Sequence, residues 1–152
     1  NMGLVKIKGV DVVLQGLWKF GNDWVFDSRL SYTYQKAQDF TDKSDKDTYG
    51  GQISYIPWHS GSAILNAGYK SWELNYSFIY TGERYDVSAN TPENYRLPWY
   101  TSDFSLAKKF SWRKYDFKLT LEVNNIFNQQ YEVVRSYPMP GTNFKFILNL
   151  TI

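Results

Sequence analysis

Apolar and polar residues alternate along most of this chain, and a period of two residues is typical of β-strands with one apolar face. The alternation is present in residues 24–35, 100–110, 115–127 and 144–152. It is clearest in residues 72–80, where the even positions are all large and apolar: Trp72, Leu74, Tyr76, Phe78 and Tyr80. The chain is therefore predicted to be all-β.

Two stretches alternate less regularly, and the second of them decides how many strands are expected. Residues 3–20 are predicted to form a strand whose apolar phase slips near Gly9, where a β-bulge is expected. The total is seven strands if residues 50–69 form one long strand. It is eight if residues 57–61 form a turn within that stretch.

The composition is rich in aromatic residues, since Phe, Trp and Tyr make up 19% of the chain, beside 21% charged residues. No run of about 18 apolar residues is present, so the sequence holds no candidate transmembrane helix. A transmembrane β-strand places only every second residue on lipid, which is compatible with this polar average. A water-soluble β-sandwich shows the same alternation and remains an alternative.

Aromatic residues stand at both ends of several predicted strands. Each pair brackets about 9 to 12 residues, which is the length that a tilted strand needs to cross the hydrocarbon of a bilayer. Such aromatic girdles favour a membrane barrel over a sandwich. The pairs are Trp72 with Tyr80, Trp24 with Tyr32 or Tyr34, and Tyr115 with Phe127.

The predicted connections alternate in length. Short turns on one side and long loops on the other are typical of outer-membrane barrels. The short joints are residues 21–23, 70–71 and 111–114, and the long polar ones are residues 39–49, 86–98 and 128–142.

Charge and chemistry exclude several classes of function. The net charge of +2 comes from basic residues spread along the chain, so no nucleic-acid partner is expected. The absence of cysteine excludes disulfides and thiolate chemistry. The sequence contains no catalytic constellation, so we expect no enzyme activity and no cofactor. His59, the only histidine, is interpreted as structural.

One acidic loop is a weak candidate for calcium. Its carboxylates are interleaved with lysines, and their spacing is similar to that of oxygen-ligand calcium loops. The loop lacks the glycine and the terminal glutamate of an EF-hand, so a solvated loop is the favoured interpretation. The candidate ligands are Asp39, Asp42, Asp45 and Asp47.

Six motifs follow one another in the order found in a known family. The longest is VNNIFNQQY at residues 123–131, which is followed by YPMPG at residues 137–141 and by Phe144. With these motifs the chain resembles the carboxy-terminal part of a TonB-dependent outer-membrane receptor of the siderophore or cobalamin type. The other motifs are KGVD at residues 8–11, PWH at 57–59 with GY at 68–69, TGERY at 81–85 and LPWYTSD at 97–103.

The resemblance implies a transmembrane antiparallel up-and-down β-barrel of about 22 strands with a plugged lumen. Residues 1–152 would hold about its last seven strands, with residues 50–69 as one of them, and the plug domain and the earlier strands would be absent. This chain departs from the family pattern at two positions. It has Thr142 where the family usually has a basic residue, and Ile152 where the family usually has Phe.

The resemblance also implies a function. The family binds and actively imports a scarce nutrient, such as siderophore-bound iron or cobalamin, across the bacterial outer membrane. The implied partners are outer-membrane lipid, the rest of the barrel, an extracellular small-molecule nutrient, and TonB through the missing plug region.

Ligand contacts are then expected in the long loops, because the barrel wall is occupied by the strand ladder. Aromatic, amide and arginine side chains there suit a large polar ligand such as a metal chelate, a corrinoid or a glycan. The candidates are Tyr85, Asn90, Asn94, Tyr95 and Arg96 in one loop, and Gln130, Tyr131, Glu132, Arg135 and Tyr137 in the last.

Two other functions remain open. A self-contained eight-stranded outer-membrane barrel for adhesion or defence would need residues 57–61 as a hairpin turn, with the strands on either side paired. A soluble ligand-binding β-sandwich would bury the aromatic face against a second sheet.

Overall fold

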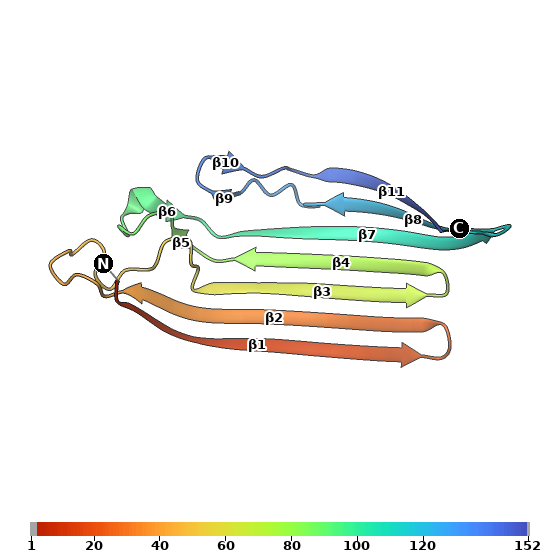
Figure 1. Cartoon of the computed structure of the whole chain (residues 1–152), viewed down its shortest axis with the longest axis horizontal. Coiled ribbons are helices and arrows are strands. Elements are labelled where there is room, and N and C mark those ends of the chain that lie inside the picture. The colour runs from red at the N-terminus through yellow and green to blue at the C-terminus, as the bar shows by residue number, and fades with distance from the viewer. Residues whose placement is uncertain (1–2, 152) are drawn as a thin grey trace.

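The computed structural model describes residues 3–151 and contains a seven-stranded antiparallel sheet (Figure 1). This confirms the predicted all-β, up-and-down architecture, and within the described residues the sheet is open rather than closed into a barrel. Ile152, predicted to end the last strand, lies outside the described residues, as do Asn1 and Met2. In sheet order the strands are β1 (Val5–Phe20), β2 (Trp24–Asp39), β3 (His59–Tyr69), β4 (Trp72–Thr81), β7 (Trp99–Trp112), β8 (Tyr115–Asn124) and β11 (Asn143–Thr151).

Long and short connections lie at opposite ends of the sheet, as the sequence predicts (Figure 1). We call the end with the short turns the turn end, and the other, at the left of Figure 1, the loop end. The first, second and third long loops at the loop end are residues 40–58, 82–98 and 125–142.

Small elements occur within the second and third long loops. The second holds β5 (Arg84–Tyr85), which pairs with β6 (Tyr95–Arg96), and the 3-10 helix η1 (Pro92–Asn94) between them. The third holds β9 (Glu132–Val134), which pairs with β10 (Tyr137–Pro138). Among residues 3–151, no helix is long and apolar enough to cross a membrane.

The register of the sheet gathers the apolar faces of its strands on one side, which we call the apolar face. Residues directly opposite each other in an antiparallel pair point to the same face. Leu74 lies opposite Leu106, Leu106 opposite Leu121, and Leu121 opposite Phe146. A slip of one residue in any pair would turn the apolar set of that strand to the other face.

Aromatic residues form two rows across the apolar face. At the turn end, Trp24 lies opposite Tyr69 and Tyr69 opposite Trp72. At the loop end, Tyr34 lies opposite His59, with ring centroids 5.1 Å apart. Trp24 and Tyr34 are ten positions apart on β2, or about 33 Å at about 3.3 Å per residue. A tilt of about 45° makes this about 24 Å of height, close to the lipid-facing band of outer-membrane barrels.

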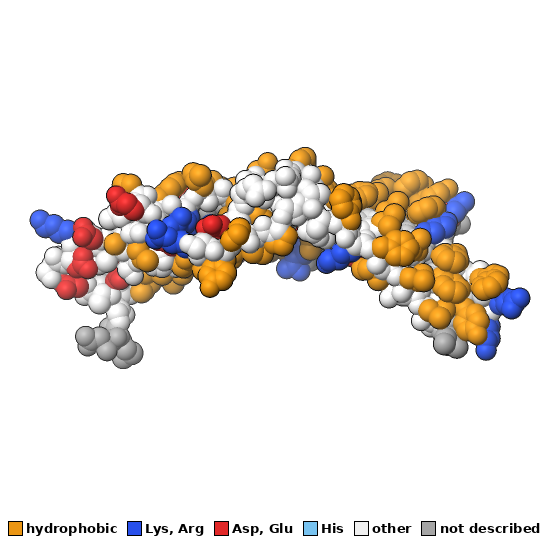
Figure 2. Space-filling view, turned by 90° about the horizontal axis from the view of Figure 1, so that it is seen from above, with side chains coloured by type: hydrophobic (Ala, Val, Ile, Leu, Met, Phe, Trp, Pro, Cys, Tyr) orange, Lys and Arg blue, Asp and Glu red, His pale blue; other side chains and the backbone are white. Residues whose placement is uncertain are grey.

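The apolar face is uncovered. Leu14, Leu148 and Phe146 are 61%, 57% and 66% exposed, and Ala37 and Ala107 are the only buried hydrophobic residues among those described. Figure 2 shows hydrophobic side chains spread over the surface, most densely towards the turn end. The described residues form no second sheet that covers this face, contrary to the β-sandwich alternative.

The opposite face, which we call the polar face, carries hydrogen-bonded polar side chains across several strands. Asn66 donates from Nδ2 to Oδ1 of Asp27 at 2.9 Å, and Asn75 donates to Oδ1 of Asn66 at 2.5 Å. Glu73 pairs with both Lys109 and Lys118. A hollow of about 490 Å³ is lined by Asp27, Asn66, Asn75, Glu73 and Lys118 together with neighbouring residues. This is the polar inner surface that the barrel prediction requires.

The bulge expected at Gly9 is wrong, because β1 and β2 pair without interruption from Val5–Asp39 to Phe20–Trp24. A β-carbon at Gly9 would lie 2.5 Å from the carbonyl oxygen of Tyr34. The apparent phase slip has another origin. The register with β2 is unbroken, but the residues of β1 that precede Val10 on the apolar face are the lysines Lys8 and Lys6.

The single strand expected over residues 50–69 is also wrong, because β3 begins only at His59. Residues 50–58 accompany the end of β2 irregularly: Gln52 bridges Gln38, but residues 54–57 leave the sheet. Tyr55 has a φ of 60°, and Pro57 has no N–H to donate to a ladder. Residues 50–58 follow β2 and form no hairpin with β3, so the pairing required by the eight-stranded alternative does not occur.

The strand expected over residues 115–127 ends early, at Asn124. Asn125 and Asn128 both have a φ of 50°, in the left-handed region that asparagine tolerates better than most residues. Phe127, predicted as a girdle residue of this strand, therefore lies in the third long loop, where it is 63% exposed.

Candidate ligand-binding groove

A groove of about 460 Å³ runs between the second and third long loops at the loop end of the sheet. The second loop supplies one wall and the third loop the other. The lining residues are Tyr95, Arg96, Leu97, Pro98, Trp99, Gln129, Gln130, Tyr131, Glu132 and Pro138.

An aromatic pair joins the two walls. Trp99, the first residue of β7, stacks on Tyr131 of the third loop with ring centroids 4.5 Å apart and planes 28° apart. Burial raises the pKa of the Tyr131 phenol, and the negative charge of Asp103 raises it further. The Tyr95 pKa is raised as well, by burial first and then by Glu83. Both phenols therefore stay protonated at neutral pH, where they can donate hydrogen bonds to a ligand.

A charged cluster supports the wall of the second loop. Arg96 donates from Nε to Oδ2 of Asp86 at 2.7 Å, and Nη1 of Arg135 lies 3.4 Å from the same oxygen. The Asp86 side chain is only 1% exposed. A buried carboxylate needs such partners, because an unpaired charge in the protein interior is strongly unfavourable. The cluster thus holds Arg96 in place at the groove.

Arg84 extends this cluster to the third loop. It is 3% exposed, and its Nη2 donates to the carbonyl oxygens of Glu132 and Val133 at 2.9 and 3.1 Å. Burial lowers the Arg84 pKa. Nη1 of Arg84 and Oδ1 of Asp86 are buried, and neither has a hydrogen-bond partner among the described residues. Buried polar atoms in proteins are normally satisfied, so Nη1 of Arg84 has a free donor and Oδ1 of Asp86 a free acceptor, each of which a water molecule can satisfy.

Asn125 positions the third loop. It is 4% exposed; its Nδ2 donates to the carbonyl oxygens of Gln129 and Pro140, and its Oδ1 accepts from the Gln129 backbone N–H. Its own backbone N–H donates to Asp103 at 2.7 Å. Together these bonds place Gln129 in the wall of the groove.

The first long loop is joined to the second through Gln52 and Asn90. The Gln52 backbone N–H donates to Oδ1 of Asn90 at 2.5 Å, and Nδ2 of Asn90 donates back to the Gln52 carbonyl oxygen at 3.0 Å. Gln52 also donates from Nε2 to the Glu83 carbonyl oxygen at 3.2 Å. The three long loops are therefore hydrogen-bonded to one another, directly or through a neighbour.

The structure gathers half of the ten predicted ligand contacts in the groove. Tyr85 packs edge-on against Tyr95 with ring centroids 5.7 Å apart, and Arg135 lies in the charged cluster. Asn94 holds its own loop by donating to the Ala89 carbonyl oxygen, and Asn90 joins that loop to Gln52 of the first long loop. Tyr137 is 70% exposed and does not line the groove, although its neighbour Pro138 does. The predicted residues that line the groove are Tyr95, Arg96, Gln130, Tyr131 and Glu132.

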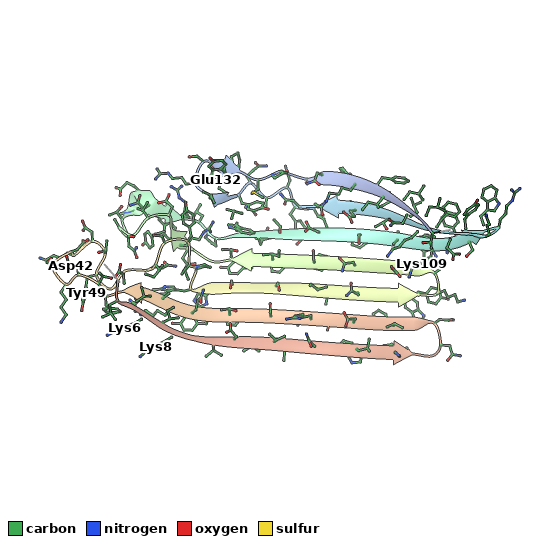
Figure 3. All side chains as sticks on the ribbon, in the orientation of Figure 1. Lys6, Lys8, Asp42, Tyr49, Lys109 and Glu132 are labelled. Carbon is green, nitrogen blue, oxygen red and sulfur yellow. The ribbon has the colours of Figure 1, made fainter. Side chains whose placement is uncertain are left out.

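Sequence reasoning missed the other five lining residues and the two buried charges that support the wall: Leu97, Pro98, Trp99, Gln129 and Pro138, with Arg84 and Asp86. Trp99 lies in the LPWYTSD motif and Arg84 in the TGERY motif, next to strand ends, where charged or aromatic residues can turn towards a loop. Nothing in the sequence indicated that Arg84 and Asp86 are buried. Figure 3 labels Glu132, the first residue of β9, which lines the groove from the third loop.

The weak calcium candidate is not supported by the geometry. Three of the four carboxylates hold a local turn: Asp39, Asp42 and Asp45 accept from the backbone N–H groups of Thr41, Ser44 and Asp47 at 2.8, 2.8 and 3.0 Å. The hydroxyl and backbone N–H of Ser44 lower the Asp42 pKa. Among residues 3–151 there is no group of three or more His, Cys, Asp or Glu that could hold a metal ion, so Asp39, Asp42, Asp45 and Asp47 do not converge on one point.

A comparison with protein families shows what this chain is similar to. The model of the family described as TonB dependent receptor-like, beta-barrel, matches residues 1–126. This range includes all of the first and second long loops and strands β1 to β8. The chain, with its open seven-stranded wall, one apolar face and long loops gathered at one end, belongs to the TonB-dependent receptor-like β-barrel family.

Proposed function

We propose that this chain is the carboxy-terminal barrel wall of a bacterial outer-membrane receptor that binds a scarce nutrient at the loop end and imports it with energy from TonB. Its family is one of outer-membrane transport receptors and is not enzymatic. The observation that carries the proposal is the groove between the second and third long loops, at the end of a wall with an apolar face and a polar face.

The two free edges of the sheet support a larger barrel. The outer edge of β1 and the outer edge of β11 pair with no other strand among the described residues. Unpaired backbone N–H and C=O groups are very costly in the hydrocarbon of a bilayer. Further strands, which would close the barrel, and a plug, which would cover the polar face, are therefore part of the proposal for residues 1–152. TonB would engage that plug region.

The chemistry of the groove suits a large polar ligand. Stacked aromatic rings offer apolar area, Gln129 and Gln130 offer amide groups, and Arg96 and Glu132 offer opposite charges. We propose a metal chelate of the siderophore class or a corrinoid such as cobalamin as the cargo.

An uptake experiment tests this function in the full-length receptor. Cells that carry the receptor as their only importer of this kind are given ⁵⁵Fe-siderophores of several chemical classes, or ⁵⁷Co-cyanocobalamin, with and without a functional TonB. We expect uptake of one cargo, dependent on TonB. Accumulation that is the same without TonB, or no binding of any of these cargoes, would count against the proposal.

A matched pair of variants connects the uptake to the groove. Gln130→Ala changes a residue of the groove wall, whereas Lys43→Ala changes an exposed residue of the first long loop outside it. The first variant is expected to raise the concentration for half-maximal uptake several-fold, and the second is expected to leave it unchanged.

A further inference from the structure

Three lysines stand at the loop end of the apolar face. Lys8 lies directly opposite Lys36, and Lys6 is the next residue of β1 on the same face. The register of β1 and β2 is unbroken, so these side chains share their face with Val10 and Tyr34, the neighbouring opposed pair. Figure 3 labels Lys6 and Lys8 near the loop end of β1. They therefore point away from the polar interior, and Lys6 and Lys36 lie against Phe40 and Trp58, the first and last residues of the first long loop.

This lysine cluster carries charge that its surroundings do not balance. Like charges directly opposite each other on neighbouring strands are destabilising. The ion pairs found among the described residues all involve other basic side chains. The ammonium groups of Lys6 and Lys36 instead lie over the rings of Phe40 and Trp58, 4.5 and 4.9 Å from the centroids. These contacts keep the cations at the face without neutralising them.

The height of the cluster indicates its surroundings. Lys8 and Lys36 stand two residues, or about 7 Å along the strand, beyond Val10 and Tyr34. Tyr34 belongs to the aromatic row that marks the edge of the hydrocarbon. The cluster thus lies at the level of the lipid headgroups, and it explains why the apolar phase of β1 stops near Gly9.

We propose that Lys6, Lys8 and Lys36 bind the phosphate of a phosphorylated lipid headgroup in the leaflet that surrounds the loop end. An anionic headgroup would remove the repulsion between Lys8 and Lys36, and ammonium groups are strong donors to phosphate oxygens. Basic residues at a membrane surface are attracted to anionic lipids. The inference rests on the membrane placement in the proposed function and is independent of the imported cargo.

Lipid retention by the full-length receptor tests this site. The wild-type receptor and Lys8→Gln/Lys36→Gln are placed in phosphatidylcholine nanodiscs that contain either lipid A, a phosphorylated glycolipid, or dephosphorylated lipid A. Native mass spectrometry after release measures the glycolipid that stays bound. The loss of two basic groups is expected to weaken retention of lipid A about thirtyfold. Retention of dephosphorylated lipid A should be weak for both proteins, and inorganic phosphate should not displace lipid A.

Two controls keep the result interpretable. Lys43→Gln/Lys46→Gln removes the same charge from exposed positions in the first long loop and should retain lipid A like the wild type. Lys8→Arg/Lys36→Arg keeps the charge and should restore retention. A second readout is thermal stability: without anionic lipid, removing the opposed lysines should stabilise the barrel, and with lipid A it should destabilise it.

Several outcomes would overturn the inference. One is that Lys8→Gln/Lys36→Gln retains lipid A as well as the wild type does. Another is that Lys43→Gln/Lys46→Gln loses as much retention as Lys8→Gln/Lys36→Gln. The third is that the wild type binds dephosphorylated lipid A as well as lipid A. The first two results would mean that these lysines are not the binding groups, and the last would mean that the phosphate is not what they recognise. Failure of the proposed import function would appear in the uptake assay and would leave lipid retention unchanged.

Discussion

Arg96 donates from Nε to Oδ2 of Asp86 at 2.7 Å, and this contact joins the wall of the groove to a carboxylate that is almost completely buried. The same oxygen faces Arg135 of the third long loop. One carboxylate therefore holds an arginine from each of the two loops that form the groove. Its removal should disturb both walls at once.

Asp86→Asn tests this arrangement. Removal of one partner of a buried ion pair costs about 3–5 kcal/mol, and since Arg96 and Arg135 are partly exposed we expect about 2 kcal/mol here. Backbone amides of residues 84–96 should exchange with solvent faster, and cargo affinity should fall about tenfold or more. Hydrogen exchange and equilibrium binding in detergent measure these effects. Asp47→Asn, at an exposed position of the first long loop, is the control and should change neither.

Trp99→Ala removes half of the aromatic pair that joins the walls of the groove. Stacked aromatic pairs contribute about 0.5–1.5 kcal/mol beyond their buried area, so cargo affinity should fall by about tenfold. Trp99→Phe keeps a ring that can stack on Tyr131, so this variant should lose only a small part of the cargo affinity. Isothermal titration calorimetry with the cargo found in the uptake assay measures the affinity of each variant. Equal affinities for Trp99→Ala and the wild type would exclude the pair from binding.

The raised Tyr131 pKa predicts a dependence on alkaline pH. A raised pKa means that the folded protein favours the neutral phenol, so the stabilisation is fully present below the ordinary tyrosine value of about 10. It is lost as the pH rises from there through the higher pKa of the folded state. The order of the third long loop should thus decline above about pH 10.

Tyr131→Phe removes this titration and is its control. Absorbance of tyrosinate near 295 nm, taken as the difference between the wild type and Tyr131→Phe, should show one phenol that titrates later than the average of the 13 tyrosines. A difference curve centred at or below the ordinary value would contradict the burial of Tyr131.

Spin labels test the assignment of the two faces. The chain contains no cysteine, so single cysteines can be introduced without background labelling. Nitroxides at Leu74, Phe117 and Leu148 are expected to be accessible to oxygen dissolved in lipid, because these residues lie on the apolar face. The matched labels at Asn75, Lys118 and Asn149 occupy the adjacent positions on the polar face and should be protected from it. Burial of the first set inside a compact particle in plain buffer would refute the membrane assignment.

The local pattern of the sequence predicted the strands and their faces well. Side chains of a strand alternate with a period of two whatever the strand pairs with, so Leu74 and Asn75 could be assigned to opposite faces before any partner was known. The connections were also predictable from local sequence, because the lengths of the polar stretches between the strands distinguish short turns from long loops. The same reasoning failed at residues 50–58, where Tyr55 has a positive φ and Pro57 cannot donate to a ladder.

The groove could be predicted only in part. Polar and aromatic loop residues such as Tyr95 and Tyr131 are recognisable as candidates in the sequence. The burial of Arg84 and Asp86 depends on contacts with a loop more than 40 residues away, such as the bond from Arg84 to the Glu132 carbonyl oxygen. Asn125 holds its loop through hydrogen bonds to Gln129 and Pro140, and Pro140 lies 15 residues further along the chain.

The sequence by itself determined the all-β class, the apolar and polar faces of each strand, the alternation of turns and loops, and the family resemblance. These properties depend on neighbours within a few residues. Only the tertiary structure decided which residues oppose each other across strands, as Lys8 and Lys36 do, and which loop residues meet in the groove. The physical reason is that strand register and loop packing are set by contacts between distant segments, which a local pattern does not contain.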